Sequence, residues 1–208
     1  MERIILIETS TALCSAALAE NGRITSYRES SAPKAHASLT AVFIQEMLEE
    51  RGLNLGDCDA ICVSMGPGSY TGLRVGVSTA KGLCFGAKKP LLAAGTLDTL
   101  VAQALDEVIT DQTEDLKYII PMVDARRMEV YTAVFSRKEG EATFTQTTET
   151  APAIIDEKQL CRPPGGRPMS VHRRRSRQMR RCHKSSERPL PSLLAKGISH
   201  ASSGYRSI

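Results

Sequence analysis

The order of apolar segments in the first 108 residues is the feature that most restricts the fold of this chain. Short apolar runs predict buried strands, and longer segments with apolar residues three and four positions apart predict helices. The Asn21-Gly22 pair predicts a hairpin, because both residues tolerate a positive φ angle. We expect strands over residues 3–9, on both sides of Asn21-Gly22 within 14–30, and over 59–65 and 91–95, with helices over 36–51, 71–87 and 96–108. The order β-β-β-α-β-α-β-α predicts an α/β lobe that begins with an antiparallel meander.

A second cycle of the same kind begins with three further predicted strands, over residues 117–126, 128–137 and 141–150. Two β-β-β-α-β-α units are how actin-like ATPase (ASKHA) folds are assembled. We therefore predict a first lobe over 1–108 and the start of a second lobe over 109–160. No helical pattern follows the second set of strands, so we expect this second lobe to be incomplete.

The charge of the chain is distributed unevenly. Residues 162–208 contain 12 basic residues and one acidic residue, a net charge of +11, whereas the whole chain carries +4. The remaining body is therefore acidic, with a net charge of −7. The basic segment is rich in Arg, Pro, Ser and Gly and cannot bury enough apolar surface to offset its ordering entropy. We predict a low-order tail over 161–208.

Two further features of the sequence bear on the cellular compartment of the protein. The chain has no basic-then-apolar leader and no run of about 18 apolar residues, so we expect neither a signal peptide nor a membrane span. Its six cysteines include no CxxC pair, which favours incidental thiols in a reducing cytoplasm over a zinc site.

A glycine-rich segment over residues 64–82 follows an apolar run and leads into a helical pattern, as phosphate-binding loops do. A Walker A loop ends in Gly-Lys-Ser/Thr, whereas here Leu73 and Arg74 follow Gly72. The dinucleotide motif GxGxxG also fails, because three residues rather than two separate Gly68 from Gly72. Neither standard phosphate motif is therefore present.

Two interpretations of this segment remain. Backbone amides at the start of the helix could hold an anion. Alternatively, Gly72, Gly76 and Ala80 form a row of small residues that lets another backbone approach closely. The candidates for a partner interface or an anion site are Gly66, Pro67, Gly68, Ser69, Tyr70, Thr71, Gly72, Arg74, Gly76 and His36.

Catalytic chemistry finds little support in the sequence. His36 is the single histidine of the acidic body, and an HxxxH metal motif would need a second histidine where Thr40 stands. No GxSxG motif is present. We predict no metal site and no catalytic residue.

A polar segment between two predicted strands contains Asp124, Arg126 and Arg127. Asp124 is a natural turn residue. The two arginines either belong to a polar hairpin turn or bind phosphate or an acidic partner, and the composition leaves both readings open.

Residues 4–22, the lone His36 before a helix, residues 65–83 with GPGSYTGLRVG, and residues 123–135 with VDARRMEVY together resemble the TsaB (YeaZ) family. These are bacterial proteins of the tRNA threonylcarbamoyladenosine pathway. The matching segments run in family order and cover residues 1 to about 155.

The resemblance implies an actin-like fold and a non-catalytic role. A TsaB protein binds and activates TsaD, the metal-containing subunit that transfers the threonylcarbamoyl group to adenosine 37 of ANN-decoding tRNAs, and the ATPase TsaE joins them. ATP and metal are then expected in the partner subunits, and tRNA is reached through the complex. The implied partner surface is formed by the helices over 36–51 and 71–87, which some family members also use to form homodimers. We therefore favour the glycine-rich loop and its helix as part of a subunit interface.

Two departures from the family are visible. Glu8 stands where the family usually has Asp, which implies that Glu8, Thr9 and Ser10 form a vestigial phosphate turn. The family also continues with strand and helix after about Leu160, where this sequence turns abruptly basic. We interpret the tail from about residue 161 as an out-of-frame reading caused by a frameshift.

Two alternatives come from other functional classes. One is a stand-alone actin-like ATPase or metallopeptidase-like enzyme, against which the missing histidine and Walker lysine argue. The other is an RNA-binding module that uses the basic tail for salt-dependent, non-specific phosphate contacts.

Overall fold

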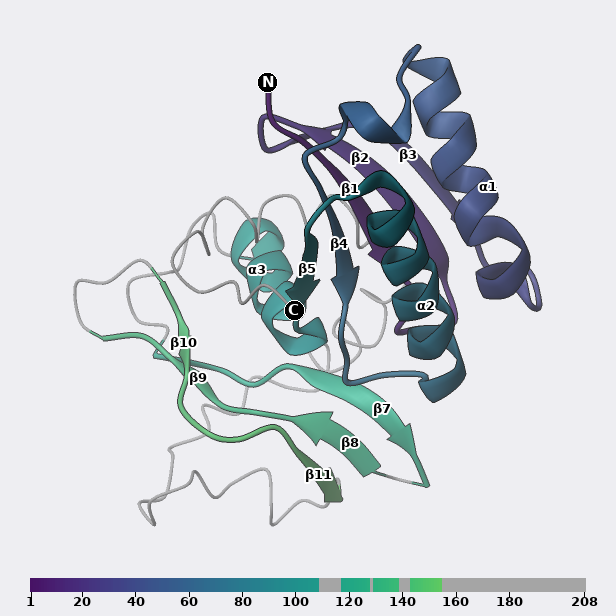
Figure 1. Cartoon of the computed structure of the whole chain (residues 1–208). Helices are drawn as coiled ribbons and strands as arrows, with labels where there is room; N and C mark the ends of the chain where they lie inside the picture. Colours follow the sequence, from purple (N-terminus) through teal and green to yellow (C-terminus); the bar gives the residue numbers. More distant parts are fainter. Residues whose placement is uncertain (109–116, 128, 139–142, 155–208) are drawn as a thin grey trace.

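The computed structural model describes residues 1–108, 117–127, 129–138 and 143–154, which are arranged as two lobes (Figure 1). The elements of the first lobe are β1 (Arg3–Glu8), β2 (Cys14–Glu20), β3 (Arg23–Ser30), α1 (Ala35–Glu50), the 3-10 turn η1 (Leu55–Asp57), β4 (Ala60–Ser64), α2 (Tyr70–Ala87), β5 (Leu91–Ala94) and α3 (Thr96–Val108). All of them fall within the predicted boundary 1–108. The predicted tail over 161–208 lies outside the described residues.

The first lobe is built on a five-stranded sheet with the order β3-β2-β1-β4-β5. β1, β2 and β3 pair antiparallel, so the predicted meander is confirmed. Its hairpin turns at Asn21 and Gly22, which have φ angles of 50° and 76°. β4 pairs parallel with both β1 and β5, because α1 and α2 carry the chain back between these strands.

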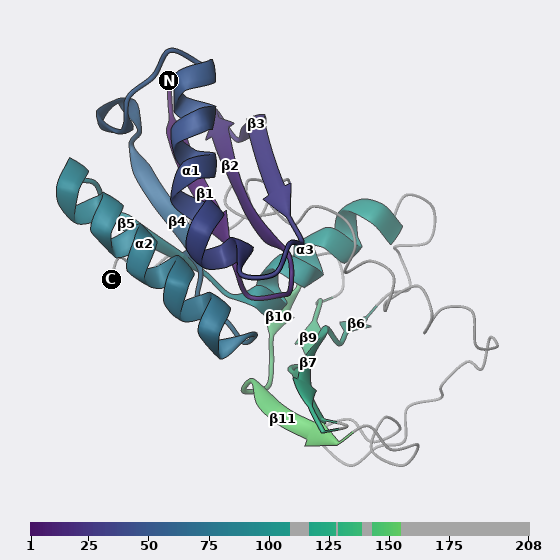
Figure 2. The same cartoon turned by 90° about the vertical axis from the view of Figure 1, so that its right-hand side faces the viewer.

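The central strands of this sheet are buried on both faces. On β1, Ile5 and Ile7 point into a core shared with Phe43 of α1, whereas Ile4 and Leu6 point to the opposite face. α1 and α2 cover one face of the sheet, and α3 lies on the other side (Figure 2). This two-sided burial explains why β1 and β4 are continuous apolar runs in the sequence.

The second lobe contains shorter strands than predicted. These are β6 (Tyr118–Ile119), β7 (Met122–Arg126), β8 (Glu129–Thr132), β9 (Phe135–Ser136), β10 (Thr145–Gln146) and β11 (Ala151–Ile154). They form two three-stranded sheets with the orders β10-β9-β6 and β11-β8-β7.

Three strand predictions in the second lobe need correction. The predicted strand over 117–126 is interrupted at Pro121, which has no amide hydrogen to donate to a ladder. The strand expected over 128–137 likewise divides into β8 and β9. Of the strand expected over 141–150, the structure describes residues 143–150, which are paired in this range at β10 alone, and pairing resumes in β11. A threonine-rich run has strand propensity but no apolar side that would specify its register.

A small apolar cluster connects the two lobes. Leu97 and Val101 of α3 are buried together with Ala133 and Phe135 of the second lobe. The second lobe therefore completes its buried core with a helix that belongs to the first. Within the described ranges, no helix combines the length and apolarity that crossing a membrane requires.

Candidate functional site

The carboxyl ends of the parallel strands β1, β4 and β5 lie along one edge of the first sheet, the usual position of a binding site in an open α/β sheet. Glu8 ends β1 and is fully buried. Its Oε1 accepts hydrogen bonds from the Ser10 amide at 2.6 Å and from the Ser64 hydroxyl at 2.9 Å. Glu8 thus joins the end of β1 to its following loop and to the end of β4.

The charge state of Glu8 follows from its burial. Desolvation raises the pKa of this carboxyl, and the hydrogen bonds that Ser10 and Ser64 donate lower it by less. Its Oε2 is buried without a hydrogen-bond partner, as are the hydroxyls of Thr9 and Ser10. The turn that the resemblance implied to be a vestigial phosphate site is therefore closed off from solvent, and Glu8 acts there as a structural link.

The glycines of the loop before α2 and of its first turns pack directly against this β1–β2 loop. A Cβ atom at Gly72 would collide with the Thr9 carbonyl, one at Gly76 with the Thr9 hydroxyl, and one at Gly68 with Ser10. The close backbone approach that the glycine spacing suggested is therefore present, but the approaching backbone belongs to the same chain. Gly72 and Gly76 are buried in this contact inside the lobe.

Two of the backbone amides expected to hold an anion already donate hydrogen bonds within the chain. The Ser69 amide donates to the Ser10 carbonyl at 2.7 Å, and the Gly72 amide donates to the Ser69 hydroxyl at 3.3 Å. Ser69 is the N-cap of α2, and the Gly66–Pro67 peptide before it is cis. An anion could use these two amides only by displacing internal hydrogen bonds.

His36 lies in the first turn of α1, and its side chain also contacts another part of the same lobe. Its Nε2 lies 2.9 Å from the Thr11 carbonyl oxygen. Thr40, one turn later, is buried and donates its hydroxyl hydrogen bond to the His36 carbonyl at 2.6 Å. The described residues contain no group of three His, Cys, Asp or Glu side chains that could hold a metal ion.

The opposite face of α2 is open to solvent. Tyr70 is 75% exposed and Phe85 is 90% exposed. The Arg74 guanidinium carbon lies 5.5 Å from the centre of the Tyr70 ring, and Thr71 is exposed beside it. Gly82 and Gly86 are exposed on the same helix, and a Cβ atom at either would meet only open space. We call Tyr70, Arg74, Gly82, Phe85 and Gly86 the α2 outer face.

Three members of the α2 outer face, Gly82, Phe85 and Gly86, were missed by the sequence reasoning. The signal was available, because Gly82 and Gly86 repeat the four-residue spacing of Gly72 and Gly76. Ten residues separate corresponding members of the two pairs, which at 100° per residue places them on different sides of the helix.

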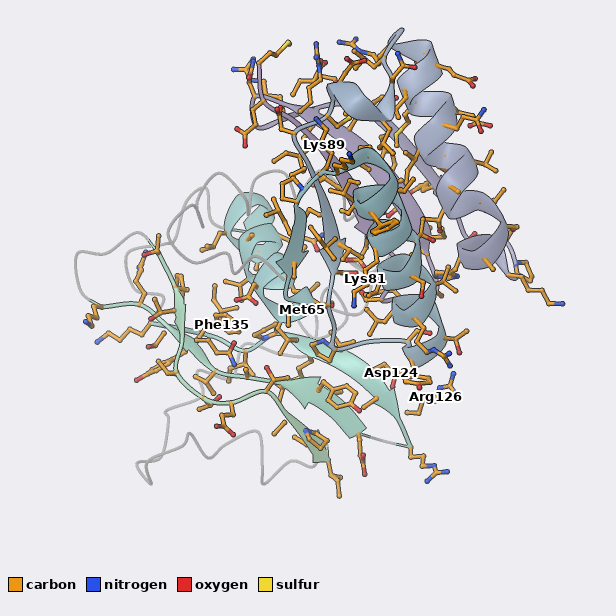
Figure 3. The ribbon with its side chains drawn as sticks, in the orientation of Figure 1. Met65, Lys81, Lys89, Asp124, Arg126 and Phe135 are labelled. Atoms are coloured by element: carbon orange, nitrogen blue, oxygen red, sulfur yellow. The ribbon has the colours of Figure 1, made fainter. Side chains whose placement is uncertain are left out.

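A basic hollow lies at the end of α2. It has a volume of about 430 Å³ and is lined by Lys81, Cys84, Phe85, Lys89, Pro90 and Leu91. The two lysines that border it are labelled in Figure 3. No acidic residue occurs between Ala60 and Leu97, so the segment that lines this hollow contributes only positive charges to it.

Asp124, expected as a turn residue, lies instead within β7, where it pairs with Val130, and the chain turns after it at Arg126 and Arg127. Asp124 Oδ1 accepts a hydrogen bond from the Arg126 amide at 2.8 Å. Arg126 and Arg127 are both exposed and have φ angles of 68° and 55°.

Comparisons with known proteins match a TsaD family model and proteins named TsaB. A family model described as "TsaD: tRNA N6-adenosine threonylcarbamoyltransferase" matches residues 29–165. The tRNA threonylcarbamoyladenosine biosynthesis protein TsaB of Escherichia coli (strain K12) is 32% identical over 75% of this chain and 65% of its own length. The TsaB protein of Haemophilus influenzae (strain ATCC 51907 / DSM 11121 / KW20 / Rd) is 36% identical over 77% of this chain and 64% of its own length.

A solved structure gives the same result. YeaZ from Pseudomonas aeruginosa superposes with a TM-score of 0.61 at 30% identity, covering 73% of this chain and 67% of that chain. The predicted actin-like (ASKHA) α/β fold is therefore confirmed. The chain spans about 65% of the length of the two curated relatives.

Proposed function

This chain belongs to the TsaB (YeaZ) family, and on that premise we propose that it is a non-catalytic subunit that binds and activates a TsaD-like transferase. The reaction is the N6-threonylcarbamoylation of adenosine 37 in ANN-decoding tRNAs. A TsaE-like ATPase joins the pair in the cytoplasm, and ATP and metal are held by the partner subunits. A homodimer would use the same surface as the transferase, so the two assemblies compete.

The α2 outer face is the observation that carries this proposal. An exposed Phe85 leaves a large apolar side chain in water, which is unfavourable unless a partner covers it. Glycine in a helix interior costs about 1 kcal/mol relative to alanine. Nothing within the described residues requires Gly82 or Gly86 to lack a side chain. A partner helix that packs closely over these glycines, with Phe85 beside them, accounts for both features.

α1 extends this surface. It lies beside α2 on the same side of the sheet (Figure 1) and exposes Val42 one turn before Glu46. Glu46 and Glu50 on its outer side are held by Arg28 at 3.6 Å and 2.7 Å. The two helices thus each expose apolar side chains beside polar ones, a mixture that suits a subunit interface.

The non-catalytic role is supported by the use of His36 and Thr40. A metal-binding pair on α1 would need two free imidazoles one turn apart. In this chain His36 bonds the Thr11 carbonyl, and position 40 holds a buried threonine whose hydroxyl bonds the same helix. Both positions are therefore occupied by structural interactions.

Capture of the TsaD-like transferase from the same cell by the full chain tests the proposal. We expect Phe85→Ala to weaken binding by about 1–2 kcal/mol, roughly 5- to 30-fold. Gly82→Leu should weaken it further, because the new side chain would block helix approach without disturbing the lobe. Ile154→Ala, at an exposed apolar position of the second lobe, is the matched control and should bind normally.

Activation is measured separately, as the rate of tRNA threonylcarbamoylation by TsaD- and TsaE-like proteins with and without the chain. No capture of the transferase and no effect on this rate would disprove the proposal. Turnover of ATP by the purified chain alone would favour the stand-alone enzyme instead.

A further inference from the structure

The turn between β7 and β8 contains arginines where its geometry favours other residues. Arg126 and Arg127 both have positive φ angles, 68° and 55°. Residues other than glycine, asparagine and aspartate are disfavoured in this region, and hairpins that need it usually contain Asn-Gly. The first lobe follows that rule at Asn21-Gly22. Backbone geometry therefore does not explain the two arginines, and their side chains are the remaining reason.

Neither guanidinium has a carboxylate partner among the described residues. Arg3, Arg28 and Arg51 of the first lobe all form ion pairs, but Arg126 and Arg127 form none within 4.0 Å. Asp124 lies two residues away, yet its Oδ1 accepts the Arg126 backbone amide and so holds the turn. Two consecutive exposed cations thus belong to one hydrogen-bonded turn.

The chemistry of these groups suits a phosphodiester backbone. The planar guanidinium presents a fork of N–H donors that matches phosphate oxygens and forms shorter, stronger hydrogen bonds than neutral donors. We propose that the Arg126–Arg127 turn contacts the phosphate backbone of the tRNA directly. This inference rests on the proposed function, which brings tRNA to the complex. It goes beyond that function, in which the partner subunit alone contacts the tRNA.

The position of the turn is compatible with simultaneous binding of a partner. Figure 3 shows Asp124 and Arg126 at the end of β7, toward the end of the molecule where α2 begins, and Lys89 beyond the other end of α2. The turn belongs to the second lobe, and the α2 outer face belongs to the first. Gly82, Phe85 and Gly86 lie in the second half of α2, between the labelled Lys81 and Lys89, so a subunit centred on them leaves the turn accessible.

The test measures the affinity of the full chain, alone and with the transferase, for an in vitro transcript of an ANN-decoding tRNA over a range of salt concentrations. The double variant Arg126→Asn with Arg127→Gly removes both charges and supplies residues that suit positive φ, so the turn is kept. The variant Arg126→Lys with Arg127→Lys keeps both positive charges but lacks the planar fork of guanidinium N–H donors. Arg23→Asn with Lys34→Asn removes two exposed cations from the first lobe and is the matched control.

We expect the Asn-Gly variant to lower the slope of log affinity against log salt by about 1.8, two phosphate contacts at roughly 0.9 each. The affinity ratio of wild type to this variant should then shrink about tenfold between roughly 50 and 200 mM salt. The Lys-Lys variant should retain most of the slope, and the first-lobe control should match wild type. The basic residues of 162–208 are common to all variants and cancel in the comparison.

An unchanged slope and affinity in the Asn-Gly variant would overturn the proposal. So would loss of transferase binding at unchanged tRNA affinity, which would identify an acidic protein as the ligand of the turn. Failure of the wild-type chain to capture the transferase would instead refute the proposed function, while the tRNA affinity of the chain alone would still test the turn.

Discussion

The two lobes differ in how their strands are covered. In the first lobe, every residue of β2 and β4 is buried, and the sheet has its own apolar cluster on each face. In the second lobe, β7 alternates between exposed and half-buried residues, and β10 is exposed throughout. The one buried cluster assigned to these strands includes α3 of the first lobe. The first lobe thus has a core of its own, and the described part of the second depends on its neighbour.

The largest effect on stability is expected from Phe135→Ala, which tests whether the second lobe depends on α3 of the first lobe. Phe135 is buried against Leu97 and Val101, and truncating a buried phenylalanine costs about 3–5 kcal/mol. Hydrogen exchange should show β8 and β9 opening while the amides of β1 and β2 keep their protection. Equal loss of protection in both lobes would mean that they unfold as a single cooperative unit.

A pair of alanine substitutions in α2 tests the core of the first lobe. Gly72→Ala places a methyl group against the Thr9 carbonyl and should destabilise the lobe by about 1–3 kcal/mol or more. Gly82→Ala meets open space and should stabilise it by about 0.5–1 kcal/mol through helix propensity. Urea unfolding measures both. Similar effects of the two changes would contradict the assignment of Gly72 to internal packing.

Two buried glutamates at opposite ends of the meander should give the first lobe opposite pH responses. Burial raises the pKa of Glu8, so the folded state holds this proton more tightly than the unfolded chain. Relative to Glu8→Gln, wild type should therefore lose stability as the pH rises above the ordinary carboxyl range. The hydrogen bond from Arg3 lowers the pKa of Glu20, so the stability of wild type relative to Glu20→Gln should fall as the pH drops through that range.

Urea unfolding between about pH 4 and pH 8 checks these signs. Glu20 accepts hydrogen bonds from Arg3 at 2.9 Å and Arg51 at 2.6 Å, which makes it the more reliable of the two tests. If the stability difference between wild type and variant changed with pH in the same direction for Glu8→Gln and Glu20→Gln, one of the two carboxyls would be solvated in solution.

The smallest effect on stability is expected at the open edge of the second lobe. Met122 is exposed on β7, an edge strand of its sheet. Met122→Lys should change the free energy of unfolding by less than about 0.5 kcal/mol. A charge on an edge strand opposes pairing with another chain, so the variant should scatter less light at high concentration. Unchanged aggregation would point to another exposed surface.

The sequence predicted the first lobe well because most of its signals are local. The apolar runs of β1 and β4, the helical spacing of α1 and the Asn21-Gly22 turn each require only a few neighbouring residues. The second lobe was predicted less accurately, because its short strands depend on register with distant partners. β11, for example, pairs with β8 more than fifteen residues earlier, and nothing local in its sequence Ala-Pro-Ala-Ile specifies that pairing.

The glycines of α2 show what the sequence determined by itself and what only the tertiary structure decided. The sequence alone determined that one helix contains two pairs of glycines, each pair at four-residue spacing, and that the surrounding motif resembles the TsaB family. Only the tertiary structure decided that Gly72 packs against the carbonyl of Thr9 and Gly76 against its side chain, whereas Gly82 and Gly86 remain open. The physical reason is that a missing side chain shows that space is available beside the backbone, and only the folded chain determines what fills that space.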